Sequence, residues 1–173
     1  MDAARPAGEN ANRSGLFGCL GIGVAVLALV AVIVIAINRY QDNKNEEIRT
    51  QWLEPWCQAI GEGRAEDAWH TLTTEGYRKD RNKDKYLANY QEASKKWGKL
   101  VSATVFNSQG TKQPGRPPFQ TAKVQTFWED NGKKIQINLY IELIKDADGI
   151  YRQDGGYIGS TENPGANMPG GPW

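Results

Sequence analysis

An uncharged apolar run at residues 16–37, LFGCLGIGVAVLALVAVIVIAI, constrains this chain more than any other feature. At about 1.5 Å per residue, a helix of this length covers the roughly 30 Å hydrocarbon core of a bilayer. A cleavable signal peptide has a shorter apolar stretch, of about 7 to 15 residues, before a small-residue cleavage site. This run ends instead in Ile37, Asn38 and Arg39. We therefore expect one uncleaved transmembrane helix, with the lipid bilayer as its partner.

The charges that flank this helix do not decide its orientation, because Arg5 and Arg13 precede it while Arg39, Lys44 and Arg49 follow it. We expect the short N-terminal tail in the cytoplasm and the C-terminal domain outside the cytoplasmic membrane. The reason is that an N-terminal anchor followed by a folded domain commonly translocates that domain. The expected localisation is the cell membrane, as a single-pass protein.

Small residues form a stripe within the apolar run, where Gly21, Ala25 and Ala28 have the spacing i, i+4 and i+7. Such a stripe lets a second helix approach closely, so self-association through these residues is one interpretation. The other is that they are ordinary members of a helix rich in Ala and Val. The sequence leaves both open.

Charge and cysteine content exclude several function classes. The chain of 173 residues has 21 Lys and Arg against 20 Asp and Glu, so its nearly neutral field gives no reason to expect nucleic acid as a partner. Cys19 lies in the apolar run and Cys57 in the C-terminal part, which argues against an intramolecular disulfide. No ligand spacing predicts a metal site, and no motif implies a cofactor. We expect Cys57 to be a buried structural thiol.

Composition also divides the chain into segments. Residues 1–15 and 161–173 are rich in Pro, Gly, Ala and Asn and are predicted to be disordered tails. Residues 16–37 are the predicted membrane helix, 38–47 a juxtamembrane linker and 48–160 one globular domain. A domain of this size is expected to have a single hydrophobic core.

The first half of this domain is predicted to be helical, because its apolar residues recur every three or four positions. The first helix carries Ile48, Trp52, Trp56 and Ile60. Pro55 should kink this helix or mark its true start, and Gly61 and Gly63 should end it. The second helix carries Ala65, Ala68, Trp69 and Leu72, with Gly76 as its expected C-terminal cap. The third carries Tyr86, Tyr90, Ala93 and Trp97, with Asn82 as its N-cap.

The second half alternates between apolar and polar residues, which predicts strands, among them 100–106, 133–145 and 150–159. Residues 108–118, SQGTKQPGRPP, are predicted to be an exposed mobile loop. Asn131-Gly132 is typical of a tight hairpin turn, because a type I′ turn needs positive φ at both positions.

Placing Asp130 opposite Lys133 pairs residues 128, 126, 124 and 122 with 135, 137, 139 and 141. The turn at Asp148-Gly149 then brings Ile158 opposite Leu139 and Tyr157 beside Tyr140. The predicted fold class is α+β: a transmembrane helix, then three helices packed on one face of a curved antiparallel sheet of about four strands.

The sequence predicts three helices followed by an antiparallel meander. Two segments within them are typical of a known superfamily: Gly-Arg-Ala-Glu-Asp-Ala-Trp at 63–69 and Gly-Ile-Tyr-Arg-Gln-Asp-Gly-Gly at 149–156. With these, residues 45–160 resemble the nuclear transport factor two-like, or cystatin-like, superfamily. The chain is similar in particular to small membrane-anchored bacterial members of unknown function, although it lacks the small hairpin that many members place after the second helix. The superfamily includes isomerases, dehydratases, polyketide cyclases, ligand carriers, transport factors and inner-membrane assembly proteins of type IV secretion systems. Fold alone therefore does not select a function.

Enzymes of that superfamily use a pocket between helices and sheet, and the candidate pocket residues here are Trp52, Trp56, Trp69, Trp128 and Asp154. Asp154 is the one ionisable group that the register places near this apolar face, beside Leu143. It is a candidate general base, although a bulge at Gly155-Gly156 should turn its side chain outward. His70, the only histidine, is expected to be a surface residue. No catalytic residue is assigned.

Two polar surfaces are candidates for binding. The sheet face away from the helices is predicted to carry Lys123, Gln125, Asn138, Tyr140, Glu142 and Tyr157. The segment 78–85 is basic and is interpreted either as a contact with lipid headgroups or an acidic partner, or as a solvated loop.

These observations favour a membrane-tethered, non-enzymatic interaction or assembly domain, whose partner is another membrane or envelope protein or a second copy. The alternative is a domain that binds a small apolar ligand, or an isomerase-like enzyme, using the pocket between helices and sheet.

Overall fold

The computed structural model describes residues 13–161, with side chains from 26 to 156, and the chain divides into two compact units at residues 42 and 43. Residues 1–12 and 162–173, which make up most of the two predicted tails, lie outside the described residues.

The first unit consists of helix α1, Arg13–Ile48, up to Asp42. Its apolar stretch has a mean hydropathy of 1.3 and is 0% buried, so by length and composition it can cross a membrane, as an anchor or a signal sequence would. Residues 38–47, expected to be a linker, continue the helix, and from Asn43 onward they belong to the second unit.

The predicted first helix of the domain consists of two parts. A π-helical turn, η1, Arg49–Leu53, follows α1 and leads into α2, Glu54–Gly61, where Pro55 lies in the first turn. The amide of Glu54 donates to the carbonyl of Arg49, five residues earlier. A proline is tolerated at this place because its missing N–H and its ring disturb a helix least in the first turn. Pro55 thus marks the start of α2, and Gly61 ends α2 as predicted.

Three further helices follow: α3, Ala65–Leu72; α4, Glu75–Asp80; and α5, Lys83–Trp97. The prediction for Gly76 was wrong, because α3 ends in extended Thr73 and Gly76 lies inside α4. The Thr74 hydroxyl accepts a hydrogen bond from the Tyr77 amide at 3.0 Å and so caps a new helix. The predicted N-cap of α5 is confirmed, since Asn82 Oδ1 accepts from the Lys85 amide at 3.0 Å.

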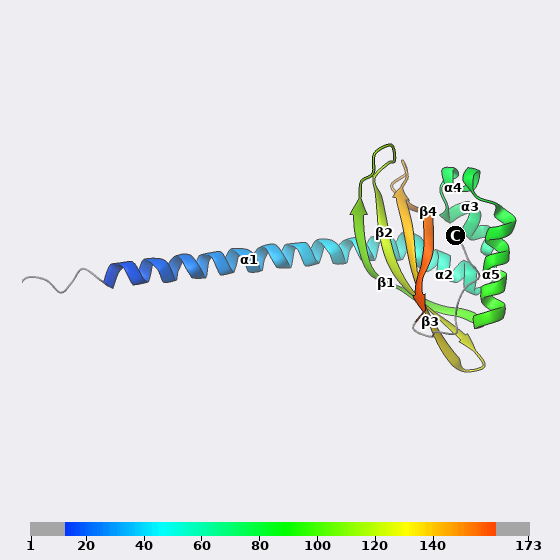
Figure 1. Ribbon diagram of the computed structural model, residues 1–173, viewed down its shortest axis with the longest axis horizontal. Coiled ribbons are helices and arrows are strands. Elements are labelled where there is room, and N and C mark those ends of the chain that lie inside the picture. Colours follow the sequence, from blue (N-terminus) through cyan, green and yellow to red (C-terminus); the bar gives the residue numbers. More distant parts are fainter. Residues whose placement is uncertain (1–12, 162–173) are drawn as a thin grey trace, which may run out of the picture. The chain divides into compact units, whose positions relative to one another are not determined.

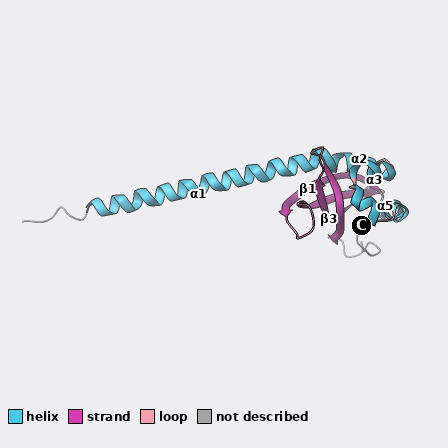
Figure 2. Ribbon diagram, turned by 90° about the horizontal axis from the view of Figure 1, so that it is seen from above, coloured by secondary structure: helices cyan, strands magenta, loops and turns pink. Residues whose placement is uncertain are grey.

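The sheet has four antiparallel strands in the order β1-β2-β3-β4. They are β1, Lys99–Thr111; β2, Phe119–Asp130; β3, Lys133–Lys145; and β4, Tyr151–Thr161. Helices α2 to α5 gather on one side of these strands (Figure 1), and the view from above shows α2, α3 and α5 on the same side (Figure 2). The predicted α+β class is confirmed, with a short fourth helix, α4, in addition.

The predicted register of the central hairpin is confirmed. Trp128 pairs with Ile135 and Val124 with Leu139, and the turn residues Asn131 and Gly132 have φ of 50° and 80°. The second hairpin also has its predicted partners, Ile158 opposite Leu139 and Tyr157 opposite Tyr140. Turn chemistry and hydrophobic alternation specify the same pairing, and therefore the register is well determined.

The first strand differs from its prediction. It continues to Thr111, so residues 108–111 are strand and only 112–118 form the loop. The pairing of β1 with β2 skips Val101 and Phe106, and each of these is the extra residue of a β-bulge. A bulge interrupts the alternation of side chains between the two faces of a strand. A strict two-residue repeat therefore does not describe these positions.

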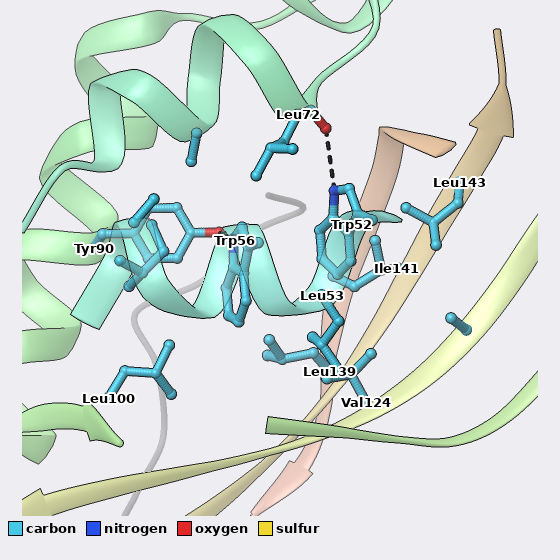
Figure 3. Close-up of a cluster of buried hydrophobic side chains, with 14 of the residues drawn as sticks. Trp52, Leu53, Trp56, Leu72, Tyr90, Leu100, Val124, Leu139, Ile141 and Leu143 are labelled. Atoms are coloured by element: carbon cyan, nitrogen blue, oxygen red, sulfur yellow. Dashed lines mark hydrogen bonds between the residues drawn. The ribbon is translucent and has the colours of Figure 1, made fainter. Parts of the chain in front are cut away.

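The core lies between the sheet and the helices. Trp52, Leu53 and Trp56 project from η1 and α2 toward Leu139, Ile141 and Val124 of the sheet on one side and toward Leu72 and Tyr90 on the other (Figure 3). The end of α1 is tied to the same unit, because Lys44 Nζ donates to the Tyr151 hydroxyl at 3.2 Å and Asn45 Oδ1 accepts from the Ser108 hydroxyl at 2.8 Å.

Candidate functional site

The four tryptophans of the predicted pocket are packed into the core. Trp52, Trp56, Trp69 and Trp128 are each at most 3% exposed. Trp52 and Trp56 stack with ring centres 5.5 Å apart, whereas Trp69 contacts Tyr86 at 5.0 Å. Trp128 packs separately against Trp97 at 5.6 Å. These four side chains are thus members of the core, with almost none of their surface exposed.

Three of these tryptophans donate their indole N–H to acceptors inside the domain. The indole N–H of Trp52 donates to the Leu72 carbonyl at 3.1 Å, that of Trp56 to the Tyr90 hydroxyl at 3.3 Å, and that of Trp128 to Thr126 at 3.1 Å. Burial raises the pKa of Tyr90 to about 12, so its hydroxyl stays protonated at neutral pH. No phenolate base is available from this residue.

Asp154 is held at the edge of the sheet. β4 pairs Gly155 with Glu142 and Gln153 with Leu143, so the extra residue of the bulge is Asp154 itself and not the following glycines. The Asp154 carboxylate accepts hydrogen bonds from the Thr74 hydroxyl at 2.6 Å and from Arg116 at 2.9 Å. These bonds give the carboxylate a structural role, in joining β4 to the start of α4 and to the β1–β2 loop.

Gln153 lies in the core at the position where the predicted strand register placed Asp154. Its side chain is 1% exposed and faces Leu143, and neither amide atom has a hydrogen-bond partner within the described part of the chain. An amide does not titrate, so this position provides no general acid or base. Sequence reasoning missed Gln153 because the bulge displaces β4 by one residue.

Arg116 covers one end of the sheet face that lies away from the helices. Its guanidinium lies 4.4 Å from the centre of the Phe119 ring and pairs with Glu142 at 3.0 Å and Asp154 at 2.9 Å. Burial acts to lower the pKa of Arg116, but the hydrogen bonds to the two carboxylates outweigh it and raise that pKa. Glu142, predicted as a binding residue of this face, is therefore engaged within the domain.

The open part of this face carries a row of three side chains from neighbouring strands, Phe106, Lys123 and Tyr140, which we call the outer-face row. The Lys123 ammonium lies 5.2 Å from the Phe106 ring centre and 5.9 Å from that of Tyr140. Phe106 is 62% exposed. Among the other predicted binding residues, Gln125 is half-buried and Asn138 is buried, and the Tyr157 side chain lies outside the described residues.

Phe106 was absent from the predicted set, although its exposure exceeds that of every other described aromatic of the sheet. The bulge between Val105 and Asn107 turns it toward the face of Lys123. The sequence contains only a weak signal for this, an aromatic at the end of the alternating stretch.

The remaining candidates are not brought together. His70 is exposed and lies 3.8 Å from Glu66, and Cys57 is half-buried, with burial raising the pKa of its thiol. Ala28 is exposed on α1, whereas for Gly21 and Ala25 the structure describes only the helical backbone. Across the residues that the structure describes, no group of three potential ligands could hold a metal ion.

A hollow of about 410 Å³ lies elsewhere, between α2 and the start of β1, where Leu53, Cys57 and Val101 line it. Its acidic rim residues are already paired, Glu54 with Arg49 and Glu62 with Arg64. The hollow is thus a shallow seam between two elements, without an acid/base pair.

Comparison of the chain with models of known protein families, with curated proteins and with solved structures finds no match.

Proposed function

We propose that this chain is a membrane-tethered, non-enzymatic interaction domain that binds a partner protein through the outer-face row. The observation that carries the proposal is Phe106, a large aromatic that is 62% exposed beside Lys123 and Tyr140. Two further observations support it. The apolar helix α1 is 0% buried, and the tryptophans between helices and sheet are at most 3% exposed.

The row has the chemistry of an interface centre. Aromatic side chains that become fully desolvated dominate the affinity of many protein interfaces. Lys123 lies near both rings, and each such cation–π contact is worth about 0.5–1 kcal/mol at an exposed site. A side chain that is already ordered loses less conformational entropy when a partner binds. The row is therefore suited to a protein partner with a complementary apolar pocket.

Replacing Phe106 with Ser is expected to weaken binding strongly without unfolding the domain. The tagged full chain is extracted from its native membranes in mild detergent, and co-purifying proteins are quantified. A loss of about 30-fold in captured partner is expected, equivalent to about 2 kcal/mol at an interface centre. The free energy of unfolding should change by no more than about 1 kcal/mol, because the ring is exposed and loses mainly its contact with Lys123.

Ile150→Ser is the matched control, because Ile150 is an apolar residue that is 40% exposed and precedes β4, away from the row. It should retain the partner. Equal loss in both variants, or a strictly monomeric chain without any partner, would refute the proposal. A captured second copy of this chain that is lost only in the Phe106 variant would identify the partner as self.

We further propose that the domain lies outside the cytoplasmic membrane, with α1 as an uncleaved anchor. The length and exposure of the apolar helix support the anchor. The side is inferred because an N-terminal anchor followed by a folded domain commonly translocates that domain. A reporter fused after Trp173 that is active only outside the cytoplasm should give signal, and one active only in the cytoplasm should not. The opposite pattern would reverse the orientation, and a protein shortened by cleavage after the apolar run would identify a signal peptide.

The arrangement of the domain also supports kinship with the nuclear transport factor two-like superfamily. Helices come first in the chain, and a four-stranded antiparallel meander then supplies the sheet they pack on. An experimental structure should superpose on members of the superfamily over the helices and all four strands in this order. A different strand order in that structure would exclude the kinship.

A further inference from the structure

The basic segment 78–85 contains five cationic side chains, and the structure divides them by role. Three are engaged within the domain. Arg78 donates to the carbonyls of Thr73 and, at 3.3 Å, of His70, near the end of α3. Lys79 pairs with Glu75 at 2.8 Å and Lys83 with Glu66 at 2.5 Å. These three therefore neutralise charge or cap a helix end.

The other two, Arg81 and Lys85, have no carboxylate within ion-pair distance among the described residues. Both line the same hollow of about 200 Å³ between α4 and α5. The hollow is lined in full by Tyr77, Asp80, Arg81, Asn82, Lys85, Tyr86 and Asn89. Two cations without an ion pair in the described part of the chain thus line one concave site.

The walls of the hollow hold these groups in place. Tyr77 and Tyr86 are each 3% exposed and contact each other with ring centres 6.5 Å apart, so the floor is rigid. The Arg81 guanidinium lies 6.0 Å from the centre of the Tyr77 ring. Asn82 uses its carbonyl oxygen to cap α5, which leaves its side-chain nitrogen as a hydrogen-bond donor at the rim.

The field at this site favours an anion. α5 is 15 residues long and begins here, so the positive end of its dipole adds to the two side-chain charges. Asp80 contributes one negative charge at the rim, and the two cations outnumber it. Arginine and lysine with amide donors are the groups that bind phosphate oxygens, arginine through its planar fork.

We propose that the Arg81–Lys85 hollow binds a single phosphate group, from either a soluble phosphate ester or a phospholipid headgroup. The proposal is independent of the outer-face row, because the hollow lies between two helices and the row lies on the sheet. One tetrahedral anion fits a hollow of this size, whereas a nucleic acid strand would need a longer basic surface.

The test uses the full chain in nanodiscs of zwitterionic lipid, titrated with inorganic phosphate at constant ionic strength. Calorimetry should show saturable binding, and the backbone amide signals of residues 82–89 should shift. Arg81→Gln and Lys85→Gln should each weaken binding at least about 10-fold, since each removes a charge-assisted hydrogen bond. Both side chains are exposed, so circular dichroism should show an unchanged fold.

Lys79→Gln is the matched control, because Lys79 is an exposed lysine of the same segment that is already paired with Glu75. It should bind phosphate as the unchanged chain does. Absence of saturable binding would overturn the proposal. Equal weakening in the control would also overturn it, because phosphate would then respond to the overall surface charge and not to the hollow. In nanodiscs that contain an anionic phospholipid, loss of the phosphate signal identifies the headgroup as the source, and a retained signal identifies a soluble phosphate.

Discussion

Trp52→Ala is expected to lower the free energy of unfolding by about 3–5 kcal/mol, a large part of the stability of a domain of this size. Trp52 is fully buried, stacks on Trp56 at 5.5 Å and packs between Leu72 and the sheet (Figure 3). The substitution leaves a cavity in the middle of the core. It also removes the donor to the Leu72 carbonyl, at 3.1 Å, which then stays buried without a partner.

Denaturant unfolding of the full chain in detergent, followed by tryptophan fluorescence, measures this loss. Trp52→Phe is the matched control, because it keeps an aromatic ring and removes mainly the hydrogen bond. It should cost about 1–3 kcal/mol, clearly less than the alanine variant. If Trp52→Ala cost less than about 1 kcal/mol, the space between helices and sheet would have to be open, and the ligand-binding alternative would regain support.

Gly98→Ala is expected to be comparably severe, with a loss of at least about 4 kcal/mol or failure to fold. Gly98 joins α5 to β1 with φ of 81° and ψ of −145°, a backbone conformation that is essentially restricted to glycine. An added Cβ would lie 2.0 Å from the carbonyl oxygen of Glu129, which is part of β2. The clash is with backbone, so the strand itself would have to move.

Gly63→Ala provides the comparison, because Gly63 also has positive φ, 74°, but nothing lies within 4 Å of its added Cβ. It should cost only about 1–2 kcal/mol, the cost of the left-handed conformation. The difference between the two variants in the free energy of unfolding measures the close approach of α5 and β2. Equal effects of both substitutions would contradict the tight junction at Gly98.

Sequence reasoning predicted which residues lie on the inner face of the sheet. It did not predict the positions of Phe106 and Asp154 correctly. Trp128, Val124 and Ile137 are buried as the register required, because alternation and the Asn131-Gly132 turn act locally and agree. Phe106 was missed and Asp154 was misplaced for a common reason. Each is the extra residue of a bulge, and a bulge depends on how two strands match along their whole length, which local periodicity does not contain.

The hollow at Arg81 and Lys85 is a second feature that the sequence alone does not predict. The sequence contains five cations in eight residues, and it does not tell which of them find carboxylates. Glu66 lies 17 positions before Lys83, and only the packing of α3 against α5 brings them together. Pairing between distant residues is decided by tertiary structure, since it depends on distances that neither composition nor spacing specifies.

The long apolar helix, the α+β class, the hairpin register and the N-cap of α5 were determined by the sequence alone, because each depends on interactions within one element or across one turn. The tertiary structure decided that the tryptophans are buried between helices and sheet, that Gln153 replaces Asp154 in the core, and that Phe106 joins Lys123 and Tyr140 on the outer face. These outcomes depend on packing between layers and on bulges, which involve residues far apart in the chain.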